Sequence, residues 1–217
     1  MIIILFGPPG SGKGTQAAKI SSLMSFKTLS TGDLLRSEIA AGTPLGKEIR
    51  NDVESGKLVD DETVIKLVNK AIEGRKNTNF ILDGFPRTLE QAKKINAVLN
   101  QLGQQIACVI ELQVDQNELV KRIVNRFSCK NCGANYNKLF KLPEKEGVCD
   151  VCGGEEFITR ADDNEEVIVK RFKEYQELTT PILPYYKEQG ILFEVNADLD
   201  ASDIFREIAK ILKNVLT

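Results

Sequence analysis

The chain has 217 residues, a net charge of −2 and 42% hydrophobic residues, which predicts one folded domain with insertions rather than a disordered protein. It contains no histidine, which excludes Ser-His-Asp and Cys-His catalysis and any histidine-ligated metal. The slightly acidic balance argues against a general affinity for nucleic acid. The apolar run at residues 2–6 is too short to span a bilayer and lacks the basic flank of a signal peptide. We therefore expect a cytoplasmic protein without membrane contact.

Apolar runs alternate with helical patterns along the chain, and this alternation predicts an α/β fold with a parallel sheet flanked by helices. Pro181 and Pro184 should bend or break the long segment that contains them. Ser202 is the expected cap of the last helix. In chain order, we expect a strand at residues 2–6, helices at 13–24, 33–41 and 61–73, a strand at 80–83, a helix at 89–102, a strand at 106–112, a helix at 117–126, a helical segment at 164–187, a strand at 192–195 and a helix ending near 216.

Two stretches do not fit this alternation. Residues 30–59 are helical and polar, and residues 126–163 are rich in Gly, Asn and Lys and carry four cysteines. We therefore expect a single domain whose core consists of residues 1–29, 60–125 and 164–217, with two inserted segments.

A glycine-rich loop follows the first predicted strand and precedes the first predicted helix. Residues 7–15 read Gly-Pro-Pro-Gly-Ser-Gly-Lys-Gly-Thr, and this context favours a phosphate-binding loop over a simple turn with a surface lysine. Backbone N–H groups and the helix start would bind the anion, and Lys13 would add a positive charge. Gly14 stands where the general pattern has the Mg²⁺-binding Ser or Thr, and Thr15 follows it. The predicted triphosphate contacts are Gly10, Ser11, Gly12, Lys13, Gly14 and Thr15.

Four of the five cysteines form two pairs, Cys129 with Cys132 and Cys149 with Cys152, separated by sixteen residues. This spacing predicts a four-thiolate metal site, with four free thiols as the alternative. Zn²⁺ suits two similar pairs better than iron does, although spacing alone leaves iron open. Four protein ligands leave no open position, so the metal would be structural. Cys108 stands in an apolar run and is expected to be a buried core residue.

The loop and three further motifs together resemble the adenylate kinase family. The motifs are Ser-Thr-Gly-Asp-Leu-Leu-Arg at 30–36, Leu-Asp-Gly-Phe-Pro-Arg at 82–87 and Thr-Arg-Ala-Asp-Asp at 159–163. The cysteine segment is similar to the metal-binding lid of the family's long form. This resemblance covers essentially the whole chain. It implies a P-loop nucleoside-triphosphate hydrolase-like fold, the reaction ATP + AMP ⇌ 2 ADP with Mg²⁺, an AMP-binding insertion at 30–59 and a lid at 126–163.

The resemblance also implies roles for individual residues. Arginine suits this chemistry because its planar fork binds phosphate oxygens and stays charged. The implied catalytic residues are Lys13, Arg87, Arg122, Arg126, Arg160 and Arg171. The implied AMP site consists of Thr31, Arg36, Lys57, Leu58, Val59, Gly84, Phe85, Pro86, Arg87, Gln91, Arg160 and Arg171. Further ATP contacts are implied for Arg126, Asn135, Tyr136 and Leu199.

Several of these residues have a second interpretation. Arg122 and Arg126 are four residues apart and should share a helix face, as an anion site or as an ordinary solvated face. The amide of Gln91 can read an adenine edge or face solvent. Tyr136 packs on a base or within the lid. Asp83, at the end of a buried run, holds Mg²⁺ through water or caps a turn.

The expected partners are ATP, AMP and ADP, with the chain acting as a monomer. The acceptor phosphate is already an anion, so no general base is needed, and catalysis would rest on positioning and charge stabilisation. Nearby alternatives are another nucleoside monophosphate kinase and an AMP kinase that uses GTP. A more distant one is a zinc-ribbon ATPase that binds nucleic acid through the lysines of the cysteine segment. A catalytically inactive nucleotide sensor is the last alternative.

Overall fold

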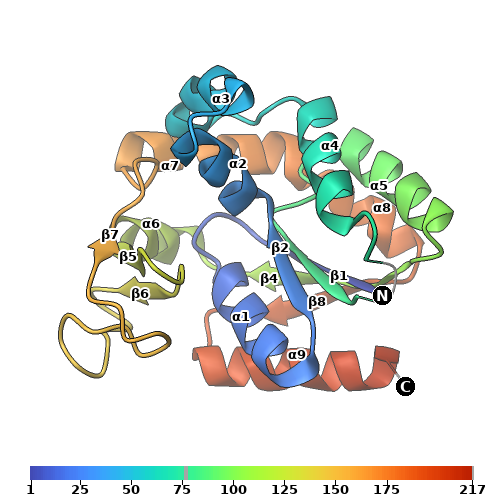
Figure 1. Ribbon diagram of the computed structural model, residues 1–217. Helices are drawn as coiled ribbons and strands as arrows, with labels where there is room; N and C mark the ends of the chain where they lie inside the picture. Colours follow the sequence, from blue (N-terminus) through green and yellow to red (C-terminus); the bar gives the residue numbers. More distant parts are fainter. Residues whose placement is uncertain (76–77, 217) are drawn as a thin grey trace.

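The computed structural model describes residues 1–75 and 78–216, with the backbone alone at residues 116–118. Within these residues, five parallel strands form the central sheet in the order β2-β3-β1-β4-β8. The predicted α/β fold is therefore confirmed, with helices on both faces of the sheet (Figure 1). The strands are β1 (Ile2–Phe6), β2 (Lys27–Ser30), β3 (Phe80–Asp83), β4 (Ile106–Gln113) and β8 (Leu192–Asn196).

Each face of the sheet packs against its own helices. One face, with Ile3 and Leu5 of β1, contacts α1 (Lys13–Met24) and α9 (Ala201–Leu216). The other face, with Ile2 and Ile4, contacts α4 (Asp61–Ile72), α5 (Leu89–Gln101) and α8 (Ile182–Glu188). Successive side chains of a strand point to opposite faces. Because both faces are covered, every residue of β1 is buried, and this explains its uninterrupted apolar sequence.

The segment at 30–59 forms two helices, α2 (Thr31–Ala40) and α3 (Pro44–Ser55), which pack on each other beyond the carboxyl end of β2 (Figure 1). The side chain of Ser30 caps α2 by accepting from the N–H of Asp33. The side chain of Thr43 caps α3, whose first position is a proline, a residue that fits a helix start well.

The cysteine segment, residues 126–163, which we call the lid, forms a small antiparallel sheet in the order β6-β5-β7 that lies to one side of the core (Figure 1). Its strands are β5 (Arg126–Cys129), β6 (Asn135–Asn137) and β7 (Phe157–Ile158). It is connected to the core by α6 (Gln116–Val124) on one side and by α7 (Glu165–Glu174) on the other.

Two sequence expectations need correction. α6 ends at Val124, where the side chain of Asn125 donates to the carbonyl of Lys121, so Arg126 lies on β5 and shares no helix face with Arg122. Ser202 is not a cap, because α9 already begins at Ala201.

The long segment after the lid breaks at Thr180 and Pro181, as predicted for the first of its prolines. A π-helical turn, η1 (Tyr175–Thr179), follows α7, and Pro181 directly precedes α8. Pro184 lies in the first turn of α8, where proline is tolerated. No helix in the described ranges is long and apolar enough to cross a membrane.

We expect Ile4→Ala to destabilise the protein by about 2–5 kcal/mol, because the side chain is fully buried in the central strand and its removal leaves a cavity. Leu23→Ala is the matched control on α1, since Leu23 is 69% exposed and its loss should cost less than about 0.5 kcal/mol. Chemical denaturation measures both changes. Equal stabilities of the two variants would contradict the assignment of this sheet face to the core.

Candidate active site

The loop between β1 and α1 surrounds the ammonium group of Lys13. Its Nζ donates to the carbonyl oxygens of Gly7 at 2.7 Å and Pro8 at 2.9 Å. Gly10 has a φ of +82°, and a Cβ there would lie 2.8 Å from Ile123 on α6, so the position requires glycine for both backbone and space. No side chain caps the start of α1, so its first N–H groups can bind an anion.

Lys13 and Asp83 lie near each other at the carboxyl end of the sheet, and their charges influence one another. Burial lowers the pKa of Lys13 to about 8, which Asp83 opposes, while nearby arginines lower it further. Burial raises the pKa of Asp83, and Lys13 is the main group that opposes this rise. An additional negative charge at this point would favour the protonated form of Lys13.

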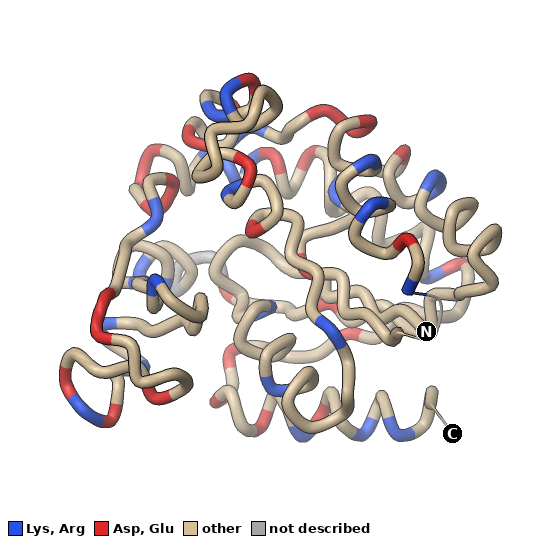
Figure 2. The backbone as a smooth tube through the Cα atoms, in the orientation of Figure 1, with Lys and Arg blue, Asp and Glu red and all other residues tan. Residues whose placement is uncertain are grey.

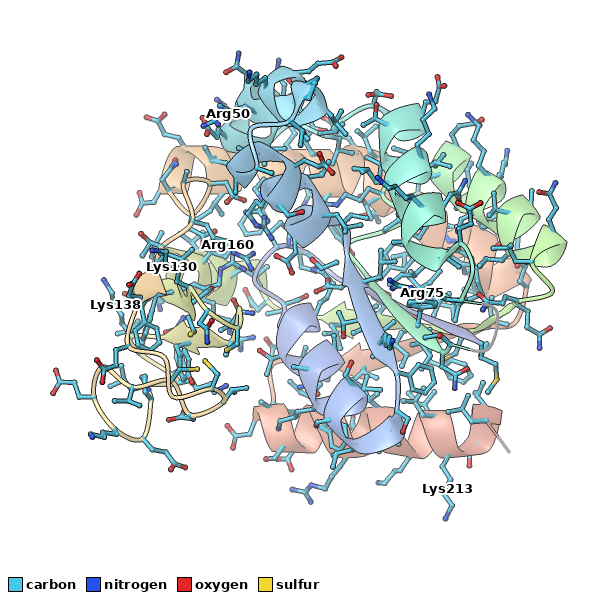
Figure 3. The ribbon with its side chains drawn as sticks, viewed as in Figure 1. Arg50, Arg75, Lys130, Lys138, Arg160 and Lys213 are labelled. Carbon is cyan, nitrogen blue, oxygen red and sulfur yellow. The ribbon has the colours of Figure 1, made fainter. Side chains whose placement is uncertain are left out.

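Five of the predicted arginines converge near this pair, and we refer to them as the arginine cluster. Their guanidinium charges act on one another or on Lys13, as the causes of the pKa shifts show. Burial together with these like charges lowers the pKa of Arg160 and of Arg171 to about 10. Figure 3 shows Arg160 where the lid meets the core, and Lys130 and Lys138 on the lid farther from the core. The cluster consists of Arg36, Arg87, Arg126, Arg160 and Arg171.

Aspartates hold most of this cluster in place. Asp163, with a side chain only 2% exposed, accepts two hydrogen bonds from Arg126 at 2.5 and 2.8 Å. Asp162 accepts from Arg171 at 2.8 Å. Asp33 accepts from Arg36 at 2.6 Å, and its Oδ1 lies 3.7 Å from Arg160. In Figure 2, acidic and basic positions lie side by side where the lid, α2 and α7 approach one another.

Arg122 contacts the loop between β8 and α9. Its Nη1 donates to the carbonyl of Ala197 at 3.3 Å, in the loop that leads to Leu199. The side chain of Leu199 is exposed on that loop. The structure therefore brings Arg122 to the same loop as Leu199, a residue predicted to bind ATP.

A cavity lies between α2, α3 and the core. The residues predicted for AMP that line it are Thr31, Arg36, Lys57, Leu58, Val59, Gly84, Arg87, Gln91 and Arg171. Phe85 and Pro86 are buried, and Arg160 belongs to the cluster rather than to the cavity wall. The sequence reasoning did not identify Gly32, Leu35, Val53, Gly56, Val64 and Asp162, which also line the cavity. The apolar residues among them are indistinguishable from core positions until α2 and α3 are packed together.

Two side chains hold the backbone of Arg87 at the edge of this cavity. Its N–H donates to Gln91 Oε1 at 2.7 Å, and its carbonyl accepts from Thr179 Oγ1, on the π-helical turn, at 3.0 Å. The carbonyl of Gly84 accepts from Arg87 Nε at 2.9 Å and from Thr31 Oγ1 at 2.8 Å. Hydrogen bonds thus hold both the backbone and the Nε of Arg87, and together they orient its guanidinium.

The four lid cysteines lie together as the sequence predicts. Their sulfur atoms lie within 4.8 Å of one another, and Cys129–Cys152 and Cys132–Cys149 are each 3.6 Å apart. Zn–S bonds of about 2.3 Å in a tetrahedron place the sulfurs about 3.8 Å apart, so the donor set fits a metal ion. The hydroxyl of Tyr136 donates to Cys149 and lowers the pKa of that thiol to about 6, which favours the thiolate that a metal binds.

Of the two interpretations of the Tyr136 side chain, the structure favours packing within the lid. The ring is only 2% exposed and stacks on Phe127, with centroids 5.6 Å apart, while Phe157 meets it edge-on. With both neighbours inside the lid, the ring belongs to the lid core, as the alternative interpretation has it. Asn135 lies closer to the phosphate-binding loop, since a Cβ on Gly14 would be 3.6 Å from its Nδ2.

The comparisons with known proteins agree with this geometry. A family profile described as adenylate kinase matches residues 5–191. Proteins named adenylate kinase from Zymomonas mobilis and Archaeoglobus fulgidus are 46% and 42% identical to this chain, covering 98% and 99% of it and 96% and 99% of their own lengths. An adenylate kinase from Enterococcus faecalis is 41% identical over 98% of this chain and 99% of its own. The chain therefore belongs to the adenylate kinase family and is an enzyme of this type.

Proposed function

We propose that this enzyme transfers the γ-phosphoryl group of MgATP reversibly to AMP, giving two molecules of ADP. The observation that carries the proposal is the arginine cluster, which lies between the Lys13 loop and the cavity beside α2 and α3. Three aspartates, Asp33, Asp162 and Asp163, pair with arginines of the cluster and offset only part of its positive charge. The remaining buried positive charge favours a bound anion. Two nucleotides bound end to end, with their phosphates meeting at the cluster, would supply that anion.

The donor phosphates would bind to the Lys13 loop. Its backbone N–H groups, the start of α1 and the Lys13 ammonium provide the positive side of this site. Asp83 offers a carboxylate oxygen of the kind that Mg²⁺ prefers, and we assign it to the metal through water. When bound, Mg²⁺ neutralises charge on the transferring phosphate. Gly10–Thr15 and Asn135 remain proposed ATP contacts.

The acceptor would occupy the cavity. Its phosphate would lie against Arg36 and Arg87, and its base near Gln91 between the apolar side chains of Leu35 and Val64. Arg87 is well suited to this task because its backbone and its Nε are both fixed by hydrogen bonds. A fixed guanidinium loses little freedom when it binds phosphate, so more of its binding free energy orients the acceptor.

Transfer itself would need little covalent help from the protein. The acceptor oxygen is already anionic, so the task is to align it with the γ-phosphorus and to stabilise the charge that spreads over the transferring group. Arg126 and Arg160 of the lid and Arg171 of α7 can provide this stabilisation from the lid side of the site. A lid that closes over the nucleotides would exclude water and so suppress hydrolysis of ATP.

We propose that the lid metal is a structural Zn²⁺. Its four thiolate ligands leave no position for substrate, and the buried apolar residues of the lid are few, which supports a role in folding. Thiols that serve as metal ligands are typical of a reducing compartment, and this supports the expected cytoplasmic location.

A coupled assay of ADP formation from ATP and AMP tests the proposed reaction. We expect the wild-type protein to form ADP and Arg87→Ala to raise the KM for AMP by about 10- to 100-fold, the loss typical of one charged hydrogen bond. Arg206→Ala is the matched control, because Arg206 lies on the exposed side of α9, where it pairs with Asp203. An inactive wild-type protein, or an Arg87→Ala variant with an unchanged KM for AMP, would contradict the proposal.

The pH dependence of kcat/KM for ATP should report the charge of Lys13. Below its pKa of about 8 the side chain is an ammonium that binds phosphate, and above this pH it becomes neutral. We expect kcat/KM for ATP to fall as the pH rises through about 8, because this parameter reports the free enzyme. The fall in kcat should come at higher pH, because bound phosphates favour the charged form. The residual kcat/KM of Lys13→Arg should not fall near pH 8. A wild-type kcat/KM for ATP that stays level to pH 10 would refute the role of the Lys13 ammonium in binding phosphate.

Removal of one thiolate should lower both metal content and thermal stability. We expect Cys149→Ser to lose most of the one metal ion per chain, as measured by elemental analysis, and to melt at a lower temperature. Cys108→Ala should keep the ion, because Cys108 is buried in β4, away from the four clustered sulfurs. Elemental analysis also separates zinc from iron. If the metal-free and metal-bound proteins melt at one temperature, the structural role is wrong.

A further inference from the structure

Asp61, the first residue of α4, binds the start of α5 with both of its carboxylate oxygens. Its Oδ1 accepts from Gln91 Nε2 at 2.8 Å, and its Oδ2 accepts from Thr88 Oγ1 at 2.8 Å. Thr88 in turn caps α5 by accepting from the N–H of Gln91 at 3.1 Å. Asp61 is not among the residues that line the cavity, yet it is directly bonded to Gln91, which does line it.

These contacts give the Gln91 amide a single orientation. The backbone N–H of Arg87 can only donate, and it meets Oε1 at 2.7 Å. The carboxylate of Asp61 can only accept, and it meets Nε2. If the amide turned by half a rotation, two donors would face each other on one side and two acceptors on the other. Gln91 is only 2% exposed, so water could not replace the lost hydrogen bonds.

A fixed amide distinguishes bases by the polarity of their edges. After its two protein bonds, Gln91 keeps one N–H and one oxygen lone pair for a ligand. A 6-aminopurine presents an N–H donor at position 6 and an acceptor at N1, whereas a 6-oxopurine presents an acceptor at position 6 and a donor at N1. An amide that can turn pairs with either edge, but an amide in one orientation pairs with only one of them.

We propose that Asp61 is a positioning residue that determines acceptor specificity, because it fixes the Gln91 amide in the orientation that selects a 6-aminopurine monophosphate over a 6-oxopurine monophosphate. The inference rests on the proposed use of the cavity for AMP. Asp61 acts through Gln91 and does not touch the base. A carboxylate suits this role because it only accepts hydrogen bonds, whereas a side chain with both a donor and an acceptor tolerates either amide orientation.

The test compares AMP with inosine monophosphate, which differs at position 6 and N1 of the base, as acceptors with ATP as donor. The readout is the ratio of the two kcat/KM values. We expect Asp61→Ala to lower this ratio by about tenfold or more, the loss typical of a hydrogen bond to a charged group, chiefly through slower reaction of AMP. Asp61→Asn should lower it less and in the same direction, since a neutral acceptor can remain in place.

Two neighbours in the same helical turn provide matched controls. Asp60→Asn keeps the cap of α4, because Asn accepts from the N–H of Thr63 as Asp does. Glu62→Ala removes an exposed carboxylate that pairs with Lys66. Both variants should keep the wild-type ratio. In a Gln91→Ala background, Asp61→Ala should change the ratio no further, because the side chain through which it acts is gone.

The outcomes separate this inference from the proposed function. A wild-type protein that does not phosphorylate AMP overturns both. A wild-type protein that prefers AMP, with an Asp61→Ala variant that slows AMP and inosine monophosphate equally, overturns the inference alone and assigns Asp61 a purely structural role. A further fall of the ratio in the Gln91→Ala background also overturns it. Thermal melting shows whether each variant is folded. If Asp61→Ala does not fold, the ratio measured for Asp61→Asn takes its place, and an unchanged ratio in that variant overturns the inference.

Discussion

The organisation of this molecule depends on the repulsion between positive charges that must lie close together. Lys13 and the arginine cluster lie close together and are partly buried. Burial, and to a lesser extent the neighbouring positive charges, lowers the pKa values of Lys13, Arg160 and Arg171. In a medium of low dielectric constant such repulsion is strong, so the fold must supply negative partners. Asp83, Asp162 and Asp163 do this from the core and from the end of the lid.

The topology explains how charges from distant parts of the chain meet. The strands of the sheet are parallel, so the loops after β1 and β3 both begin at the carboxyl ends of the strands. This brings Lys13 next to Asp83 and Arg87. α2 contributes Arg36 from the first insertion, β5 contributes Arg126 from the lid, and α7 contributes Arg171. Because these cations lie on different elements, they do not repel one another within a single helix or strand. The site is complete only when residues 30–59 and 126–163 fold against the core.

Sequence reasoning was most successful where one physical requirement dominates. The fully buried run of β1, the glycines around Lys13 and the paired cysteines each allow few alternatives, and the structure places them as predicted. The edge strand β2 was missed because only Leu29 of its four residues is buried, so it has no apolar pattern. The predicted position of Arg126 on a helix was wrong. α6 ends where the side chain of Asn125 bonds to the carbonyl of Lys121, and the spacing of residues in the sequence does not reveal this bond. The ring of Tyr136 was open to two interpretations, and only the packing of Phe127 and Phe157 around it decides between them.

The aspartates that hold Arg126 and Arg171 have a kinetic consequence. Each guanidinium is paired with a carboxylate of the same chain, at 2.5 Å for Arg126 and 2.8 Å for Arg171. If these arginines bind the transferring phosphate, as we propose, part of each ion pair must open first. In the proposed reaction, Asp163 and Asp162 would therefore compete with the substrate for these arginines and weaken nucleotide binding in the ground state. They would also bind the arginines again once the products separate. A reversible enzyme would gain from this arrangement, since products held too tightly would limit turnover in both directions.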